Sequence, residues 1–471
     1  MAESDTPRAP SPIDLAVRAI TRRDVLKGAA AVAGIAATSG ILAACSGGAS
    51  PAASSAAPAG SAPAASSGGS AAASGGGASG STSLGSNYSD DVPKKAMQAV
   101  VDAFKQKSGI DVTVNTVEHG KFQDSINSYL QGTPDDVFTW FAGHRMRFFA
   151  AQGLATDISD VWGQVGSNYA DAFKTASTGD DGKQYFIPFY NYPWVIIYRK
   201  SLWSDKGYEQ PKTWDDLKTL AGKMKSDGLI PIAFADKDGW PAMGTFDILN
   251  MRLNGYQFHV DLMNGKEKWS DPKVKSVFDA WKEIVPFLQT GALGRTWQDA
   301  AQSMIKKQAG MYFLGTFAGE QATNKADHDD LDFFAFPTLG TQFDSEQAID
   351  APIDGFMLSK APKNPDAAKA FLEYLATGAA QGVFLASSPN NVAAAKDADT
   401  SKYSPFQQKM AEIIGASQKI AQFLDRDARP DFAGPNGMQH FLQAFLGSPD
   451  QDTTKLQGQI QSFYDSLGPE S

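Results

Sequence analysis

The stretch Tyr185–Lys200 limits what this chain can fold into more than any other. It reads Tyr-Phe-Ile-Pro-Phe-Tyr-Asn-Tyr-Pro-Trp-Val-Ile-Ile-Tyr-Arg-Lys. Its second half, Val195–Tyr198, is an unbroken apolar and aromatic run, as in a strand buried on both faces. Pro188 and Pro193 interrupt the first half, and proline suits the edge or entry of a strand because it has no backbone donor. We therefore expect the stretch to cross between two lobes beside a cleft.

Length and charge narrow the class of protein. The 471 residues exceed one typical hydrophobic core, which favours two lobes. The formal net charge of -10 argues against a nucleic-acid partner, which needs a basic face. The sequence contains no phosphate-cradling glycine loop and no zinc-protease His-Glu-x-x-His pattern. We expect no cofactor and no metal.

The first 45 residues have the features of an export signal. Arg22 and Arg23 precede a weakly apolar, Ala/Gly-rich run that is too short to span a membrane permanently, and the pair resembles a twin-arginine signal. The run ends in Leu42-Ala-Ala-Cys45, which resembles the lipobox of bacterial lipoproteins. The prediction is a twin-arginine lipoprotein signal peptide over 1–45 with Cys45 as the lipid attachment site. The alternative is a chance thiol in a signal peptide.

Residues 46–83 are almost entirely Ala, Ser, Gly and Pro and carry no charge. Such a composition cannot bury a core, so it predicts a disordered linker. The linker would hold the folded part near a membrane surface.

Helix and strand signals then alternate. Apolar spacing predicts a helix over 93–108, and strand patterns follow over 111–117 and 135–142. After the crossover a capped helix over 213–224 precedes a strand over 231–235. This alternation predicts an α/β fold with a largely parallel sheet.

Two further segments are expected to join the lobes: 340–351, which lacks clear periodicity, and 393–404. The remainder, 404–467, is expected to be helical, with breaks near Pro430 and Pro449.

Seven ordered segments of the chain carry a family resemblance. They are Phe104–Ile110, Pro134–Phe138, Gly153–Asp160, Pro188–Lys200, Thr213–Leu217, Gly310–Phe317 and Asn364–Leu372. In this order, behind a lipobox, they resemble the extracellular solute-binding proteins of bacterial ABC sugar importers, the class that includes maltose-binding protein. Two features depart from that pattern: Ser83–Tyr88 is a poor first strand, and Phe317 stands where the family commonly has Trp.

The resemblance implies the two-lobed type II periplasmic-binding-protein fold, with a ligand cleft between lobes joined by hinge segments. It places the solute-binding domain at 84–471. Lobe 1 would comprise about 84–190 and 350–395, and lobe 2 about 191–340 and 396–471. The chain would be a monomer, exported and lipid-anchored to the outer face of the cytoplasmic membrane. It would not be an enzyme, and it would deliver a carbohydrate to ABC permease subunits that use a separate ATPase.

A sugar site needs aromatic faces for the apolar C–H surfaces and planar polar groups for the hydroxyls. Such residues at strand ends, and in the crossover, are candidates; Trp297 and Asp354 come from the resemblance. The predicted ligand-binding residues are Tyr88, Glu118, His119, Trp140, His144, Arg145, Tyr190, Asn191, Trp194, Asp238, Trp240, Trp297, Phe317 and Asp354.

Other functions stay open at this stage. The same scaffold could bind a non-sugar solute, and Arg145 leaves room for an acidic sugar. An exported carbohydrate-active enzyme would need two facing carboxylates, which Glu118, Asp238 and Asp354 could supply. Asp236-Lys-Asp-Gly239 has some features of a calcium loop, but its glycine is fourth and not sixth.

Overall fold

The computed structural model describes residues 79–468. The predicted signal peptide over 1–45, Cys45, most of the predicted linker and the last three residues lie outside the described residues. Among the described helices, none combines the length and the apolar character needed to cross a membrane.

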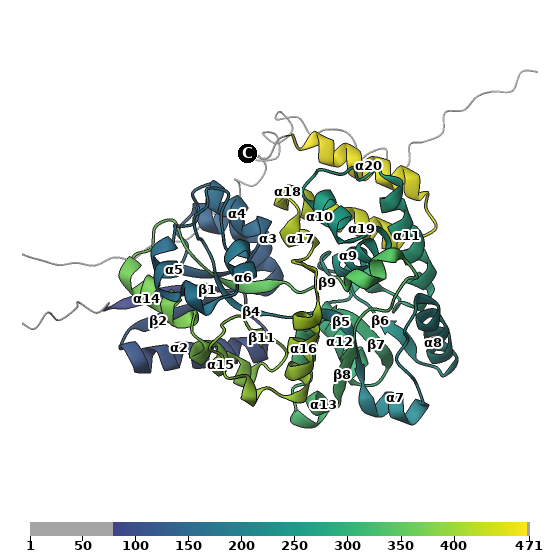
Figure 1. Ribbon diagram of the computed structural model, residues 1–471, viewed down its shortest axis with the longest axis horizontal. Coiled ribbons are helices and arrows are strands. Elements are labelled where there is room, and N and C mark those ends of the chain that lie inside the picture. Colours follow the sequence, from purple (N-terminus) through teal and green to yellow (C-terminus); the bar gives the residue numbers. More distant parts are fainter. Residues whose placement is uncertain (1–78, 469–471) are drawn as a thin grey trace, which may run out of the picture. The chain divides into compact units, whose positions relative to one another are not determined.

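The first lobe is built on a six-stranded mixed sheet with the order β11-β4-β10-β3-β1-β2 (Figure 1). Its strands are β1 (Ser81–Ser86), β2 (Asp111–Thr116), β3 (Val137–Phe141), β4 (Ile187–Asn191), β10 (Ile353–Leu358) and β11 (Val392–Ala393). Its helices are α2 (Asp91–Ser108), α3 (His119–Gln131), α4 (His144–Ala151), α5 (Ser159–Val165), α6 (Asp171–Ala176), α14 (Pro365–Leu375) and α15 (Gly378–Ser387).

The second lobe is built on a four-stranded sheet with the order β6-β7-β5-β8. Its strands are β5 (Trp194–Arg199), β6 (Ile230–Ala233), β7 (Ala309–Gly315) and β8 (Leu331–Phe334). Its helices are α7 (Lys200–Lys206), α8 (Trp214–Ser226), α9 (Pro241–Asn254), α10 (Tyr256–Met263), α11 (Pro272–Ile284), α12 (Trp297–Ile305), α13 (Lys325–Asp329), α18 (Pro430–Ala433), α19 (Met438–Gly447) and α20 (Thr453–Ser466). The short 3-10 helix η4 (Thr316–Gln321) follows β7.

Helix α8 illustrates how local sequence sets an element of the second lobe. Thr213 and Asp216 form a capping box, in which the Thr213 side chain accepts from the Asp216 amide at 3.2 Å and the Asp216 carboxylate accepts from the Thr213 amide at 3.0 Å. Trp214, Leu217 and Met224 lie buried along one face of the helix. The predicted start and buried face of this helix are confirmed.

The predicted α/β fold is confirmed, but the expectation of a largely parallel sheet is wrong. Strand β10 runs antiparallel to both β3 and β4, and β5 runs antiparallel to both β7 and β8. Alternating helices and strands imply a parallel sheet only when each helix connects neighbouring strands. Here β10 and β5 enter their sheets directly after the chain has arrived from the other lobe.

The first strand begins earlier than the sequence suggested. Ser81–Ser86 forms β1, which lies between β2 and β3, so the predicted linker does not extend to residue 83. Small residues are tolerated because the backbone ladder to β2 fixes the strand, and Thr82 Oγ1 donates to Asp136 Oδ2 at 3.0 Å. These are long-range contacts that a six-residue window cannot reveal.

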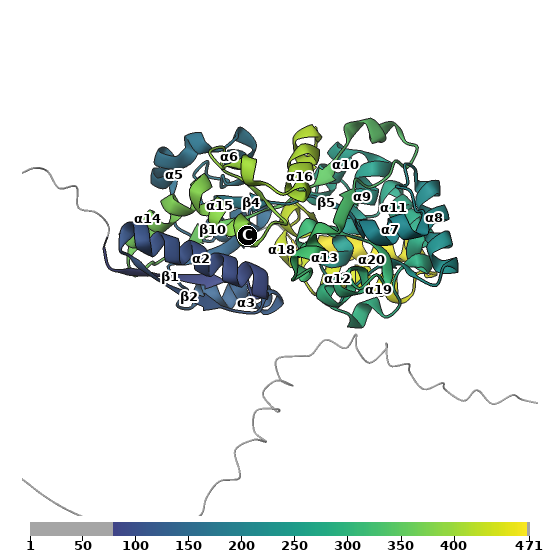
Figure 2. The same ribbon diagram turned by 90° about the horizontal axis from the view of Figure 1, so that it is seen from below.

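Three passages join the lobes, and helices α16 (Pro405–Ala416) and α18 lie along the junction in both views (Figures 1 and 2). The first passage is short: β4 ends at Asn191 and β5 begins at Trp194, so the predicted lobe boundary after residue 190 falls inside β4. In the second, β9 (Ile349–Asp350) pairs in parallel with β12 (Ile420–Ala421). The third runs from β11 to α16 and on through β12 to α17 (Leu424–Asp427).

Candidate functional site

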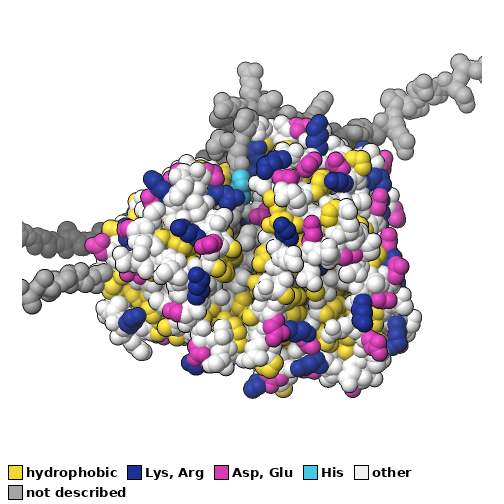
Figure 3. Space-filling model, viewed as in Figure 1, with side chains coloured by type: hydrophobic (Ala, Val, Ile, Leu, Met, Phe, Trp, Pro, Cys, Tyr) yellow, Lys and Arg dark blue, Asp and Glu magenta, His cyan; other side chains and the backbone are white. Residues whose placement is uncertain are grey.

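A cavity of about 90 Å³ lies between the two lobes. Figure 3 shows a furrow between the lobes with hydrophobic side chains along its walls. The lining residues are Asn87, Tyr88, Ser89, Asp90, Pro93, His119, Gln123, Phe141, Tyr190, Tyr192, Trp194, Trp240, Trp297, Phe317, Glu320, Pro352, Asp354, Phe423, Asp425 and Arg426.

Aromatic side chains form one continuous wall of this pocket. Trp194, at the start of β5, stacks on Phe423 with ring centroids 4.7 Å apart, and its ring lies 6.4 Å from that of Trp240. Phe317 lies 6.0 Å from Trp240 and 5.1 Å from Trp297. The turn after β6, the start of α12 and η4 hold these rings. They offer faces suited to an apolar ligand surface.

A buried ion pair lies at one side of the pocket. Arg426 Nη1 donates to Asp354 Oδ1 at 2.7 Å, and Arg426 Nη2 donates to the Tyr192 hydroxyl at 3.0 Å. The guanidinium carbon also lies 4.1 Å from the centre of the Phe141 ring. Burial raises the pKa of Asp354, although Arg426 acts in the opposite direction. Burial and the Arg426 charge lower the pKa of His119 to about 4, which keeps its imidazole neutral.

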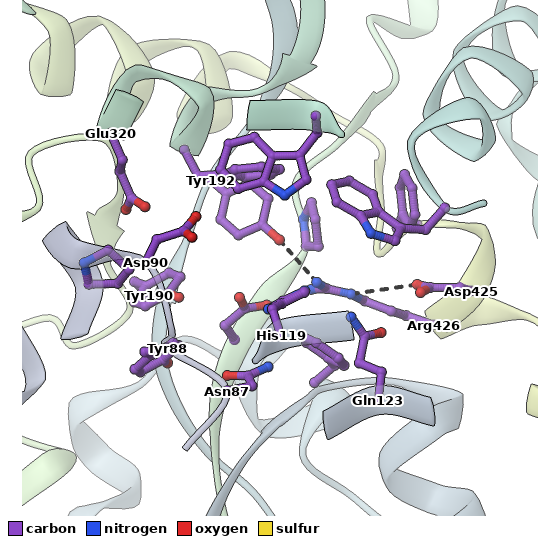
Figure 4. Close-up of a pocket in the computed structure, with 18 of the residues that line it drawn as sticks. Asn87, Tyr88, Asp90, His119, Gln123, Tyr190, Tyr192, Glu320, Asp425 and Arg426 are labelled. Atoms are coloured by element: carbon purple, nitrogen blue, oxygen red, sulfur yellow. Dashed lines mark hydrogen bonds and ion pairs between the residues drawn. The ribbon is translucent and has the colours of Figure 1, made fainter. Parts of the chain in front are cut away.

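Two carboxylates occupy the opposite side of the pocket, away from Arg426 (Figure 4). Glu320 accepts from the Ser388 hydroxyl at 2.7 Å and from Asn391 Nδ2 at 3.4 Å. Burial nevertheless raises the pKa of Glu320 to about 7. Asp90 accepts from Gln298 Nε2 at 3.3 Å, a contact between the lobes, and desolvation raises the pKa of Asp90 as well.

Several buried polar atoms of the lining residues have no hydrogen-bond partner within the described residues. They include Asn87 Oδ1 and Trp194 Nε1, whereas Asp425 Oδ1 and Arg426 Nε lack a hydrogen bond but form an ion pair with each other at 3.8 Å. Buried polar groups in proteins are nearly always paired, because an unpaired one costs about 1–3 kcal/mol. The pocket therefore presents both donors and acceptors to whatever fills it.

The structure brings eight of the predicted site residues to this pocket: Tyr88, His119, Tyr190, Trp194, Trp240, Trp297, Phe317 and Asp354. They come from both lobes. The remaining six lie elsewhere.

The expectation that Trp140 faces the cleft is wrong. Trp140 is 1% exposed and packs in the core of the first lobe, where its Nε1 donates to the Arg145 carbonyl oxygen at 3.4 Å. It lies in β3, whose residues are buried on both faces. Arg145 does not line the pocket either. Its Nη1 pairs at 3.0 Å with Asp425, which does line the pocket, from the side facing away from the cavity.

Glu118, His144, Asn191 and Asp238 also lie outside the lining. Glu118 caps α3 by accepting from two backbone amides, Gly120 at 3.0 Å and Lys121 at 2.9 Å. Asn191 is held in the β4 ladder between Ile353 and Val392. His144 begins α4, and Asp238 lies half-buried in the turn before Trp240.

Sequence reasoning missed the segment that carries Phe423, Asp425 and Arg426. It was expected to be helical, but 417–423 leaves α16, pairs through β12 and turns at Phe423, whose φ is 120°. That conformation is rare for a residue with a side chain. The sequence offered one signal, the three consecutive charged residues at 425–427. Such a run is unusual in a helix that is buried on one face.

Within residues 79–468 no group of three or more His, Cys, Asp or Glu side chains is arranged to hold a metal ion. The chemistry of the site is that of hydrogen bonding and ring stacking. It suits a hydroxyl-rich molecule with an apolar face.

Comparisons with known proteins agree with this geometry. The AglE alpha-glucosides-binding periplasmic protein of Rhizobium meliloti is 24% identical over 397 residues, covering 79% of this chain and 84% of the relative. An uncharacterized ABC transporter extracellular-binding protein of Pyrococcus horikoshii is 26% identical over 334 residues, covering 69% and 74%.

Among solved structures, the bacterial solute receptor AcbH is 45% identical with a TM-score of 0.80, and the match covers 83% of this chain and all of AcbH. That receptor is described as having an exclusive substrate preference for β-D-galactopyranose. The predicted two-lobed fold is confirmed by this match. The sequence model of the bacterial extracellular solute-binding protein family matches residues 89–382 of this chain. The chain therefore belongs to that family.

Proposed function

We propose that this chain captures a single neutral pyranose of the galactopyranose type in the pocket between its lobes and delivers it to the permease of an ABC importer. Support for a carbohydrate comes from the family and from its sugar-binding relatives. The identity of the sugar and the residues that bind it are part of the proposal.

The observation that carries the proposal is the set of unpartnered polar atoms beside an aromatic wall. A pyranose has hydroxyls that both donate and accept, so it can pair the acceptor Asn87 Oδ1 as well as the donor Trp194 Nε1. Its C–H face would lie against the rings of Trp240, Trp297 and Phe317. A simple anion does not combine these two surfaces.

The size of the cavity and the AcbH match support a monosaccharide. A cavity of about 90 Å³ is too small for a chain of several sugar rings. AcbH, at 45% identity over its whole length, is described as specific for a galactopyranose. We therefore extend that preference to this chain.

The charge of the pocket supports a neutral sugar over an acidic one. Asp90, Glu320, Asp354 and Asp425 contribute four carboxyls, and the one guanidinium among the lining residues, Arg426, is already paired with Asp354. A sugar carboxylate would add a negative charge to this set, at a cost that the low dielectric of the pocket increases. Arg145, the residue that left an acidic sugar open, does not line the pocket and is already paired with Asp425.

Capture would favour the closed arrangement of the lobes, because the lining residues come from both lobes and a ligand can touch all of them only there. Export by a twin-arginine signal, lipidation of Cys45, anchoring to the outer face of the cytoplasmic membrane and a monomeric state complete the proposal. A separate ATPase would drive transport, and this chain would release the sugar unchanged.

Calorimetric titration of the purified chain tests the proposal. D-galactose should bind, while D-galacturonate, raffinose, a short peptide and a polyamine should not bind at comparable concentrations. Recovery of the ligand after binding, checked by chromatography, separates a binding protein from a carbohydrate-active enzyme. Tight binding of a non-sugar solute, or conversion of the sugar, would overturn the proposal.

A further inference from the structure

A second cavity, of about 290 Å³, lies beside the sugar pocket. Helices α3 and α4 of the first lobe form one side of it, and the segment from α17 to α19 forms the other. Its polar lining includes Asp124, Asn127, Arg145, Asp431 and Gln439. These carboxylate, amide and guanidinium groups are the planar polar groups that pair with hydroxyls.

The two cavities share part of their walls. Gln123 and Asp425 line both of them. Figure 4 shows the Gln123 and Asp425 side chains on the Arg426 side of the sugar pocket. The partition at this place therefore consists of side chains from opposite lobes.

One residue holds these two side chains together from the second cavity. Arg145 Nη1 donates to Gln123 Oε1 at 2.8 Å and to Asp425 Oδ2 at 3.0 Å. The Arg145 guanidinium carbon lies 4.7 Å from the centre of the Trp140 ring and 5.2 Å from that of Phe141. Trp140 thus supports the partition from the core, although it does not reach the sugar.

Replacing Arg145 should open the partition, because Arg145 holds the side chains of Gln123 and Asp425 in place. Without the guanidinium, Gln123 loses the donor that fixes its amide, and no other contact within residues 79–468 joins Gln123 to Asp425. The sugar pocket and the second cavity would then form one longer site.

We propose that the second cavity is an outer subsite for the next sugar unit of a longer saccharide, and that Arg145 keeps it closed. The inference rests on the proposed function and names the residue that sets ligand length. In the native chain the closed partition restricts binding to one pyranose. Opening it gives a second, hydroxyl-rich ring the polar groups of Asp124, Asn127 and Gln439.

The test compares Arg145→Ala with the native chain. Calorimetry with D-galactose and with lactose, melibiose and β-1,4-galactobiose gives the ratio of disaccharide to monosaccharide Kd, with galactobiose presenting galactose at both ends. The native chain should bind galactose at least 100-fold more tightly than any of the disaccharides. In Arg145→Ala that ratio should fall at least tenfold for one or more of them.

Three further variants sharpen the result. Gln123→Ala removes the same partition from the pocket side and should lower the ratio in the same direction, which covers the case in which Arg145→Ala does not fold. Asn127→Trp, added to Arg145→Ala, narrows the second cavity and should restore the native ratio. The control is Arg147→Ala, in the same helix as Arg145. Arg147 lines neither cavity and pairs with the exposed Asp180 at 3.6 Å, so its replacement should leave the ratio unchanged.

The outcomes separate the two proposals. If galactose binds the native chain and both partition variants keep the native ratio, the outer subsite does not exist. If Asn127→Trp fails to reverse the gain, the second ring lies elsewhere and the inference is wrong. If no sugar binds the native chain or any variant, the proposed function itself has failed.

Discussion

Arg426 and Asp354 join the segment after β12 to the start of β10 through a buried contact of 2.7 Å, with side-chain exposures of 8% and 10%. Both residues line the pocket between the lobes, so the same pair contributes to the stability of the junction and to the polar surface of the pocket.

Replacing Arg426 with Met should lower the free energy of unfolding by about 3–5 kcal/mol, because Asp354 is left as an uncompensated buried carboxylate. Sugar binding should be lost with it. Urea denaturation and calorimetry measure the two effects. Adding Asp354→Asn should recover much of the stability without recovering binding.

The matched control for that prediction is Lys95→Met. Lys95 pairs with Asp91 at 3.6 Å, but the two side chains are 77% and 85% exposed, so stability should change by less than about 1 kcal/mol. A change in Arg426→Met no larger than this would show that the buried pair is not needed for stability.

Truncating Trp297 to Ala should weaken galactose binding by about 10- to 100-fold, because a ring contact in the site would be lost together with its apolar area. The packing between Trp297 and Phe317, whose centroids lie 5.1 Å apart, would also loosen. Trp281→Phe is the control, since Trp281 packs against Phe445 in the second lobe and does not line the pocket. Equal binding by both variants would place the ligand away from the aromatic wall.

Glu320 should make the stability of the chain depend on pH in a defined window. Its pKa is raised from 4.5 to about 7 in the folded state, so the native form binds more protons than the unfolded form between these values. The stability that Glu320 contributes is therefore present at low pH and lost as the pH rises through about 7. Relative to Glu320→Gln, the native chain should lose up to about 3 kcal/mol between pH 4.5 and 8.

Urea titrations of both proteins at several pH values test the Glu320 prediction. Burial also raises the pKa of Asp247 and Asp350, but these groups are present in both proteins and cancel in the difference. If the free energy of unfolding of the native chain, relative to that of Glu320→Gln, fell towards low pH instead of towards high pH, the prediction would be wrong.

Gly244 in α9 lets the indole of Trp194 pack flat against the helix, because a Cβ there would lie 2.3 Å from the Trp194 ring. Gly244→Ala should displace Trp194 and weaken sugar binding by at least tenfold, although Gly244 itself does not line the pocket. Gly222→Ala in α8 is the matched change, since a Cβ there meets nothing within 4 Å. It should stabilise the chain by about 1 kcal/mol and leave binding intact. Calorimetry and thermal unfolding distinguish the two.

Much of the fold followed from local pattern. The run Val195–Tyr198 became the core of β5, and the residues before it became β4 and the first passage between the lobes. Strand direction did not follow, because periodicity reports burial and not the neighbour with which a strand pairs. For the same reason the small residues of β1 looked like linker until β2 and β3 lay on either side of them.

Most of the aromatic wall was accessible from sequence, but of the charged lining residues only Asp354 was predicted, while Asp90, Glu320, Asp425 and Arg426 were not. Trp194, Trp240, Trp297 and Phe317 lie at strand ends or the first turns of helices, where residues of a cleft are expected. Trp140 met the same criterion but is buried in the core of the first lobe.

The sequence by itself determined that two α/β lobes would enclose a cleft rich in aromatic rings, because hydrophobic runs and helix caps act over a few residues. Only the tertiary structure decided that Arg426 pairs with Asp354 across 72 residues of sequence, and that Arg145 closes the wall behind them. A charged side chain enters a buried site only where a distant partner compensates it, and that partner is fixed by the packing of the whole chain.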